Sequence, residues 1–249
     1  MLLTVNMGNT RTHAVSYQDG YRSPHFATAT TPQVEHYANW LKAISLVAPT
    51  RILLASVVPP AASALAAATR ELWGLEPEVV KPREDLGVRF TTVDYKQDLG
   101  ADLFVNAVVS HHDYGGNILN VDLGTASTFC VIKDGLYLGT SIVPGMELSI
   151  KAMIQGTALL KDFALQKIDK VIQDNTTACL QSGIYFGYFE LVRGMIARIQ
   201  QEEGPLKVVL TGGIGTFLHD ELAPYVDHFR PELTLEGLRL IAQLLPQLE

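Results

Sequence analysis

VNMGNTRTHAVSYQDG, at residues 5–20, and VDLGTASTFCVIKDG, at residues 121–135, share one pattern that decides the fold. Each stretch has valine, then asparagine or aspartate, an apolar residue, glycine, and a cluster of hydroxyl or amide side chains. Each continues as a second apolar strand that ends in Asp-Gly, a strong signal for a type I′ hairpin turn, which needs positive φ at both central positions. A third extended run follows, at residues 21–28 and 136–143. The sequence therefore predicts two antiparallel three-stranded meanders, spaced by nearly half of the 249 residues.

Any two meanders share alternating hydrophobicity and a glycine turn, but here the polar residue before the apolar-Gly pair also recurs. After each meander the pattern changes to mixed helices and strands. We expect helices at residues 33–45, 61–72, 146–153, 175–201, 216–222 and 233–245, and strands at 52–58, 78–80 and 207–210. This order predicts an α/β protein of two similar domains, residues 1–115 and 116–249, joined near Gly115-Gly116-Asn117.

Charge and hydropathy exclude several classes of function. The formal net charge is −7 and the pI is near 5.5, so the surface repels polyanions and neither nucleic acid nor an anionic membrane is an expected partner. The longest apolar stretches, such as residues 51–60, are far shorter than the roughly 20 residues that cross a bilayer. No signal-type leader precedes the first strand, and we expect a soluble, cytoplasmic protein.

The two glycine turns carry the chemistry of a phosphate site. Gly8 and Gly124 let the backbone approach a phosphate closely, and nearby hydroxyls can donate to its oxygens. These hydroxyls belong to Thr10, Thr125, Ser127 and Thr128. Asp122, at a strand end, can hold a cation or its water shell. Thr211-Gly-Gly-Ile-Gly215 follows a strand and precedes a helix, where small residues leave room for a base and ribose; such a glycine pair alone is weak evidence and is often structural.

Two such hairpins in a duplicated α/β frame resemble the acetate kinase/sugar kinase/Hsp70/actin superfamily, whose ribonuclease H-like, actin-like domains hold ATP in the cleft between them. Within it, the chain resembles the type III pantothenate kinases, the group that includes the Bvg accessory factor homologues. The motifs that carry this resemblance are Gly8-Asn9-Thr10, Ser56-Val-Val-Pro59, Gly100-Ala-Asp102 with Asn106-Ala107, Asp122-Leu-Gly-Thr125-Ala126, Leu138-Gly139 with Pro144-Gly145, Asn175-Thr176, Gln181-Ser-Gly-Ile-Tyr185 and Thr211-Gly-Gly213.

The resemblance implies transfer of the γ-phosphoryl group of ATP to the primary hydroxyl of pantothenate. The product, 4′-phosphopantothenate, is the first committed intermediate of coenzyme A biosynthesis. It also implies Mg²⁺, a monovalent cation (K⁺ or NH₄⁺) and a homodimer. The long helix expected at residues 175–201 carries an apolar stripe that suits either a dimer interface or the protein core.

The resemblance also assigns roles to particular residues. Asp102 is the expected catalytic base; from sequence physics alone it is better explained as the cap of the helix that begins at Ala101. The ATP loop comprises Asn6, Met7, Gly8, Asn9, Thr10, Arg11, Thr12 and His13, with Thr125 as a second ATP contact. The pantothenate site comprises Gly100, Ala101, Asp102 and Leu103, with Thr176 reaching across the dimer interface, and Asp122 is the cation ligand.

Three positions depart from the family pattern. The family has aspartate where this chain has Asn6, arginine where it has Leu103, and tyrosine where it has Val93, although Tyr95 lies close enough to substitute. Asparagine lacks the charge that attracts a hydrated Mg²⁺, and loss of arginine removes a bidentate contact for the carboxylate of pantothenate. Each change is expected to weaken binding or turnover. Two alternatives therefore stay open: an inactive homologue that acts as a binding or regulatory protein, and a kinase with a different acceptor.

Overall fold

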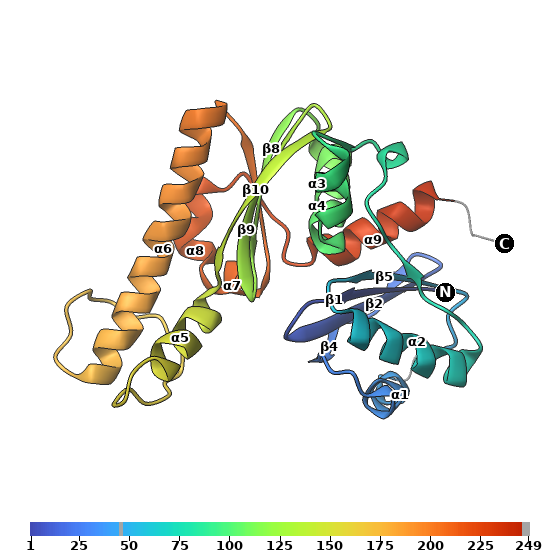
Figure 1. Ribbon diagram of the computed structural model, residues 1–249, viewed down its shortest axis with the longest axis horizontal. Coiled ribbons are helices and arrows are strands. Elements are labelled where there is room, and N and C mark those ends of the chain that lie inside the picture. The colour runs from blue at the N-terminus through green and yellow to red at the C-terminus, as the bar shows by residue number, and fades with distance from the viewer. Residues whose placement is uncertain (45–46, 246–249) are drawn as a thin grey trace. The chain divides into compact units, whose positions relative to one another are not determined.

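The computed structural model describes residues 1–44 and 47–245, except the side chain of Val93. Two mixed sheets flanked by helices form two compact units (Figure 1), which confirms the predicted fold class. Unit 1 contains residues 1–115, 134–137 and the described part of 232–249, and unit 2 contains residues 116–133 and 138–231. The final helix, which the sequence-based division places in the second half, joins unit 1 because it packs against the first strand and the helix at residues 101–114.

Unit 1 is built around its first strand. The strands of this unit are β1 (Leu2–Met7), β2 (Arg11–Gln18), β3 (Tyr21–Arg22), β4 (Phe26–Ala29), β5 (Arg51–Ser56), β6 (Glu78–Val79) and β7 (Arg89–Phe90). Its helices are α1 (Val34–Ala43), α2 (Pro59–Trp73), the 3₁₀ turn η1 (Glu84–Leu86), α3 (Val93–Asp98), α4 (Ala101–Tyr114) and α9 (Leu233–Leu244). β1 pairs antiparallel with β2 and parallel with β5, so the carboxyl ends of β1 and β5 lie at one edge of the sheet.

The two faces of the β1–β5 sheet are covered by different helices. Leu3, Val5 and Met7 are buried on the face that α1 and α2 cover. The C-terminal helix α9 contacts β1, β5 and α4. This packing follows from period-2 alternation in the strands, which sends successive side chains to opposite faces.

Both predicted Asp-Gly turns adopt positive φ at both residues, as a type I′ turn requires. The φ angles are 48° and 82° at Asp19 and Gly20, and 46° and 75° at Asp134 and Gly135. The strand predicted at residues 21–28 is wrong as a single strand, because it divides into β3 and β4 around Pro24. Proline has no N–H to donate to a ladder.

Unit 2 repeats the arrangement of unit 1. Its strands are β8 (Asn117–Leu123), β9 (Ala126–Lys133), β10 (Leu136–Pro144, which lies in this unit from residue 138 on), β11 (Lys207–Thr211) and β12 (His228–Phe229). Its helices are α5 (Met146–Gln155), α6 (Thr176–Glu203), α7 (Gly213–Phe217), α8 (His219–Leu222) and the 3₁₀ turn η2 (Ala223–Tyr225). β8 pairs antiparallel with β9 and parallel with β11, as β1 does with β2 and β5.

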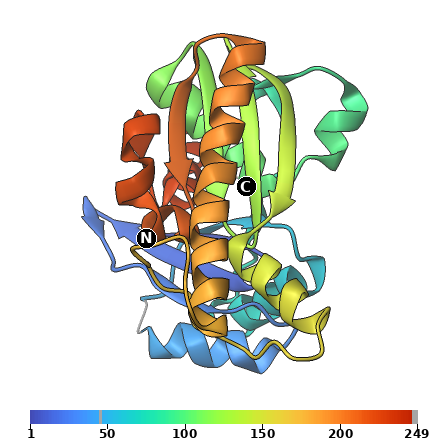
Figure 2. The same ribbon diagram turned by 90° about the vertical axis from the view of Figure 1, so that its left-hand side faces the viewer.

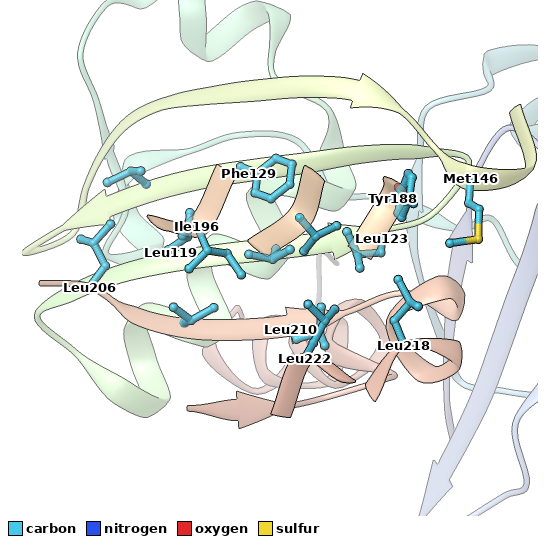
Figure 3. Packing of buried hydrophobic residues seen from close by; sticks show 14 of the residues in the cluster. Leu119, Leu123, Phe129, Met146, Tyr188, Ile196, Leu206, Leu210, Leu218 and Leu222 are labelled. Carbon is cyan, nitrogen blue, oxygen red and sulfur yellow. The ribbon is translucent and has the colours of Figure 1, made fainter. Parts of the chain in front are cut away.

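The long helix α6 runs along the second sheet (Figure 2) and forms part of the core of unit 2. Tyr188, Val192 and Ile196 of α6 pack with Leu119 and Leu123 of β8 (Figure 3). The predicted apolar stripe therefore packs in the core of unit 2. Leu191, on the same helix, is 36% exposed. Across the described residues, no helix has the length and apolar character needed to span a membrane.

Candidate active site

The first glycine turn joins β1 to β2. Met7 pairs with Thr12, which leaves four turn residues, Gly8 to Arg11, and the Gly8 N–H donates to the Arg11 carbonyl at 3.0 Å. Asn9, Thr10 and Arg11 are exposed. An exposed turn with an arginine at its end can present both backbone groups and a cation to an anion.

Thr30, which sequence reasoning missed, supports this turn from the chain that follows β4. Its hydroxyl donates to the Gly8 carbonyl at 2.8 Å, and its N–H donates to the Thr10 carbonyl at 3.1 Å. The Thr12 hydroxyl lies inside unit 1, 3.0 Å from the Thr30 hydroxyl and 3.1 Å from the Tyr37 hydroxyl. Of the eight expected ATP-loop residues, Met7 and Thr12 thus have buried side chains that hold the turn in place.

Asn6 and His13 are register partners at the base of the turn. His13 Nδ1 lies 2.9 Å from His25 Nε2, and the two rings stack with centroids 5.0 Å apart. Burial, His25 and Arg11 lower the pKa of His13 to about 4. The imidazole of His13 is therefore neutral at physiological pH and presents no positive charge to a phosphate.

Asp102 lies in the first turn of α4, as its position after Gly100-Ala101 predicts. The carboxylate accepts the Leu103 N–H at 2.8 Å. A helix N-terminus favours the charged carboxylate, but burial outweighs it and raises the pKa of Asp102 above its usual value. A raised pKa brings a carboxylate closer to the range in which a general base works well at neutral pH.

Val57 brings the first turn and the start of α4 to one place within unit 1. The Val57 N–H donates to the Met7 carbonyl at 3.3 Å, directly before the Gly8 turn. A Cβ built on Gly100 would lie 3.4 Å from Val57 Cγ1 and 2.7 Å from Asp102 Oδ1. The expected ATP loop and the expected acceptor loop therefore adjoin the same residue.

Asn106 fixes α4 from its buried face. This side chain is 1% exposed, and its Oδ1 accepts a hydrogen bond from the Thr234 hydroxyl of α9 at 2.8 Å. Because Asn106 follows Asp102 by one helical turn, the contact sets the rotation of the helix that carries Asp102.

The second glycine turn joins β8 to β9 and has three residues, Gly124 to Ala126, between the paired Leu123 and Ser127. The Gly124 N–H donates to the Ala126 carbonyl at 3.2 Å, and Thr125 is exposed. Gly145, immediately before α5, donates its N–H to the Thr125 carbonyl at 3.0 Å. The contact is so close that a side chain at Gly145 would overlap the carbonyls of the turn.

Asp122 occupies the place in unit 2 that Asn6 occupies in unit 1, at the penultimate position of the strand before the turn. Its register partner, Thr128, has a buried hydroxyl oxygen with no hydrogen-bond partner in the described structure. Gly212, with φ of 90°, brings its backbone against Asp122 and Leu123. Carboxylate and hydroxyl oxygens are the hard ligands that alkali and alkaline-earth cations prefer, so this donor set fits such a cation.

The remaining predicted positions are spread over both units. Leu103 is half-buried in the first turn of α4, and Thr176 is exposed as the first residue of α6. The side chain of Val93 lies outside the described structure. Tyr95 lies 5.7 Å from Tyr137, measured between ring centroids, within unit 1. In residues 1–44 and 47–245, no three His, Cys, Asp or Glu side chains gather into a metal site of their own.

Comparison with known proteins identifies consistent relatives. A sequence model of the type III pantothenate kinase family matches residues 2–198. A type III pantothenate kinase of Phenylobacterium zucineum is 36% identical, covering 96% of both chains, and one of Cereibacter sphaeroides strain ATCC 17025 is 37% identical over the full length of both.

Solved structures share the fold at low identity. A Campylobacter jejuni protein described as a Baf family transcriptional activator has a TM-score of 0.58 at 19% identity, covering 97% of both chains. The inorganic polyphosphate/ATP-glucomannokinase of Arthrobacter sp. strain KM has a TM-score of 0.50 at 17% identity, covering 98% of both.

Proposed function

Since the chain belongs to the type III pantothenate kinase family, we propose that it transfers the γ-phosphoryl group of ATP to the primary hydroxyl of pantothenate. The pantothenate oxygen forms a bond to the γ-phosphorus as the bond to the ADP oxygen breaks, and the hydroxyl proton passes to a base. The products are ADP and 4′-phosphopantothenate. Such a transfer depends chiefly on positioning and on stabilisation of the phosphoryl charge.

Asp102 is the proposed base, and its environment is the observation that carries the proposal. The carboxyl group has a raised pKa and lies at the start of α4, next to Gly100, which adjoins the Val57 that also contacts the end of β1. A carboxylate in this state can accept a proton as the acceptor oxygen attacks. The Leu103 N–H holds one carboxylate oxygen, and the other is the proposed proton acceptor.

The two glycine turns are the proposed phosphate contacts. Backbone N–H groups of the Gly8 turn, with Arg11, and the hydroxyl of Thr125 would donate to phosphate oxygens. His13 would contribute through a neutral ring, because the pKa of His13 is lowered to about 4. The neutral Asn6 can orient a bound water or phosphate but supplies no charge.

Asp122 and the hydroxyl of Thr128 are proposed to hold a monovalent cation, K⁺ or NH₄⁺, since their oxygens fit one. Mg²⁺ is commonly held by one or two carboxylates together with substrate phosphates, and it neutralises phosphate charge when bound. With Asn6 uncharged, Asp122 is the acidic residue of the two glycine turns that can contribute to such binding.

Recognition of pantothenate differs from the family pattern at Leu103, where an aliphatic side chain replaces an arginine. We propose that the backbone of residues 100–103 binds pantothenate and that Thr176 contributes from the second copy of a homodimer. This metabolic role supports a proposed location in the cytoplasm.

Purified protein should form ADP when it is supplied with ATP, pantothenate, Mg²⁺ and K⁺, followed in a coupled assay, with 4′-phosphopantothenate identified by mass spectrometry. Asp102→Asn should reduce turnover by about 10²–10⁴-fold, the usual contribution of a general base. The proposal is contradicted if the parent protein binds ATP but forms no product, and if the Asn6→Asp and Leu103→Arg variants also form none. That result would favour a regulatory homologue.

A further inference from the structure

Tyr188 of α6 holds the strand that follows the second glycine turn. Its hydroxyl is hydrogen bonded to the Ser127 hydroxyl of β9, and the residue lies in the same core cluster as Met146, the first residue of α5. Tyr188 is 6% exposed and Ser127 is fully buried. Figure 3 shows the Tyr188 ring beside Leu123, at the end of the core where Met146 lies.

Two contacts hold the turn from its two sides. The Gly145 N–H donates to the Thr125 carbonyl at 3.0 Å. Ser127 follows the turn residues on the other side and is bonded to Tyr188. Without the Tyr188 hydroxyl, the Thr125 carbonyl is still held by Gly145, but Ser127 loses its hydrogen bond to α6.

We propose that Tyr188 is a positioning residue for ATP: its hydroxyl fixes the turn that carries Thr125. This inference rests on the proposed kinase function, because it assumes that this turn contacts nucleotide phosphates. In this proposal Tyr188 acts on the turn through its bond to Ser127, not through a contact with substrate. Small displacements of such a turn reduce catalysis strongly because reacting groups must be held within a fraction of an ångström.

The same helix provides a matched control. Tyr185 lies three residues before Tyr188 and is similarly buried, at 5% exposure. Its hydroxyl donates to Glu221 of α8 and not to a residue beside the turn. Tyr185→Phe and Tyr188→Phe therefore each remove one buried hydroxyl from α6, but only the second removes a bond to Ser127, the residue that follows the turn.

The experiment compares Tyr188→Phe, Ser127→Ala, their double variant and Tyr185→Phe. KM for ATP, KM for pantothenate, kcat, the Kd for ATP by calorimetry and the melting temperature are measured for each. We expect Tyr188→Phe to raise KM and Kd for ATP by about fivefold to tenfold, equivalent to one hydrogen bond, with KM for pantothenate unchanged. The double variant should bind ATP no worse than either single variant, because both remove the same link. Tyr185→Phe should stay within about twofold of the parent in all kinetic constants.

Equal KM for ATP in the two tyrosine variants, or additive effects in the double variant, would overturn the positioning role. A fall in melting temperature without a change in ATP binding would assign Tyr188 to the core alone. If the parent binds ATP without phosphorylating pantothenate, the proposed function fails and the Kd values still decide this inference. If the parent binds no ATP, the inference fails too.

Discussion

Gly212 is the position where one added methyl group should damage both stability and the cation site. Its φ is 90°, a conformation that side chains of L-residues rarely adopt. A Cβ built there would lie 2.5 Å from the Leu123 carbonyl oxygen and 2.6 Å from Asp122 Oδ1. Gly212→Ala therefore forces a strained backbone and pushes directly against the proposed cation ligand.

The size of the effect follows from these distances. Ordinary carbon–oxygen contacts begin near 3.4 Å, so the Asp122 oxygen must move by about 0.8 Å to accept the methyl group. The positive φ costs about 1–2 kcal/mol and overpacking about 1–3 kcal/mol more. The free energy of unfolding should thus fall by about 2–5 kcal/mol, with each kcal/mol lowering the melting temperature by about 2–4 °C. Turnover should fall by about 10²-fold, because displacements near 1 Å have that effect.

The assay is thermal unfolding together with turnover at increasing K⁺, using Gly213→Ala as the control for stability. Gly213 is the neighbouring residue, and a Cβ there would meet no atom within 4 Å. As the first residue of α7 it should tolerate alanine, with a change in unfolding free energy of less than about 1 kcal/mol. A Gly212→Ala protein as stable and as active as the parent would refute the argument that this glycine is required by close packing on Asp122.

Three further variants test the charges of unit 1. Asp102→Asn should unfold at a higher temperature than the parent at pH 8, because the raised pKa of Asp102 means that its buried charge destabilises the native state as pH rises. The difference in melting temperature should shrink toward pH 3, and thermal scans that show the same difference at both pH values would contradict this. Burial and His25 lower the pKa of the native His13 to about 4, so between about pH 6.5 and 4 the unfolded imidazole binds a proton that the native one does not, and His13→Gln should reduce the loss of stability in this range. Urea unfolding at pH 7 and pH 4.5 measures this loss, and equal losses in parent and variant would contradict the prediction. Arg51→Ala should lower the unfolding free energy by about 2–3 kcal/mol, since the 8%-exposed guanidinium makes two 2.8 Å bonds to Glu78 and binds two carbonyls at the end of α9. Chemical denaturation measures this change, and a value below about 0.5 kcal/mol would show that water replaces those bonds.

Local patterns were sufficient for the frame of the fold. The hairpins, their Asp-Gly turns and most helices depend on residues close in sequence, so alternation and turn chemistry predict them. The difference in length between the two quoted stretches, 16 and 15 residues, corresponds to the four-residue and three-residue turns. In contrast, β7 and β12 have two residues each and exist only because neighbouring strands pair with them.

The supports of the candidate site were not predictable in the same way. Thr30, Gly145 and Tyr188 contact the turns from distant parts of the chain, and nothing in their local sequence indicates this. The placement of α9 beside α4 is also long-range, through the hydrogen bond between Thr234 and Asn106. The roles of the site residues themselves came from the family resemblance, because spacing alone explains Asp102 as a helix cap.

The two glycine turns show that a repeated sequence pattern can be supported by different contacts. Both follow a strand that pairs antiparallel with the next strand and parallel with a later one, so the frame is the same in each unit. The supports differ: hydroxyl side chains hold the Gly8 turn, whereas close backbone packing at Gly145 and a tyrosine hydroxyl hold the Gly124 turn. The charge differs as well, because Asn6 replaces in unit 1 the carboxylate that Asp122 supplies in unit 2. A neutral residue at position 6 thus removes charge from a turn whose geometry is maintained independently, by Thr30. The neutral Asn6 is therefore compatible with the observed shape of the Gly8 turn, and its effect should fall on any metal binding rather than on the fold.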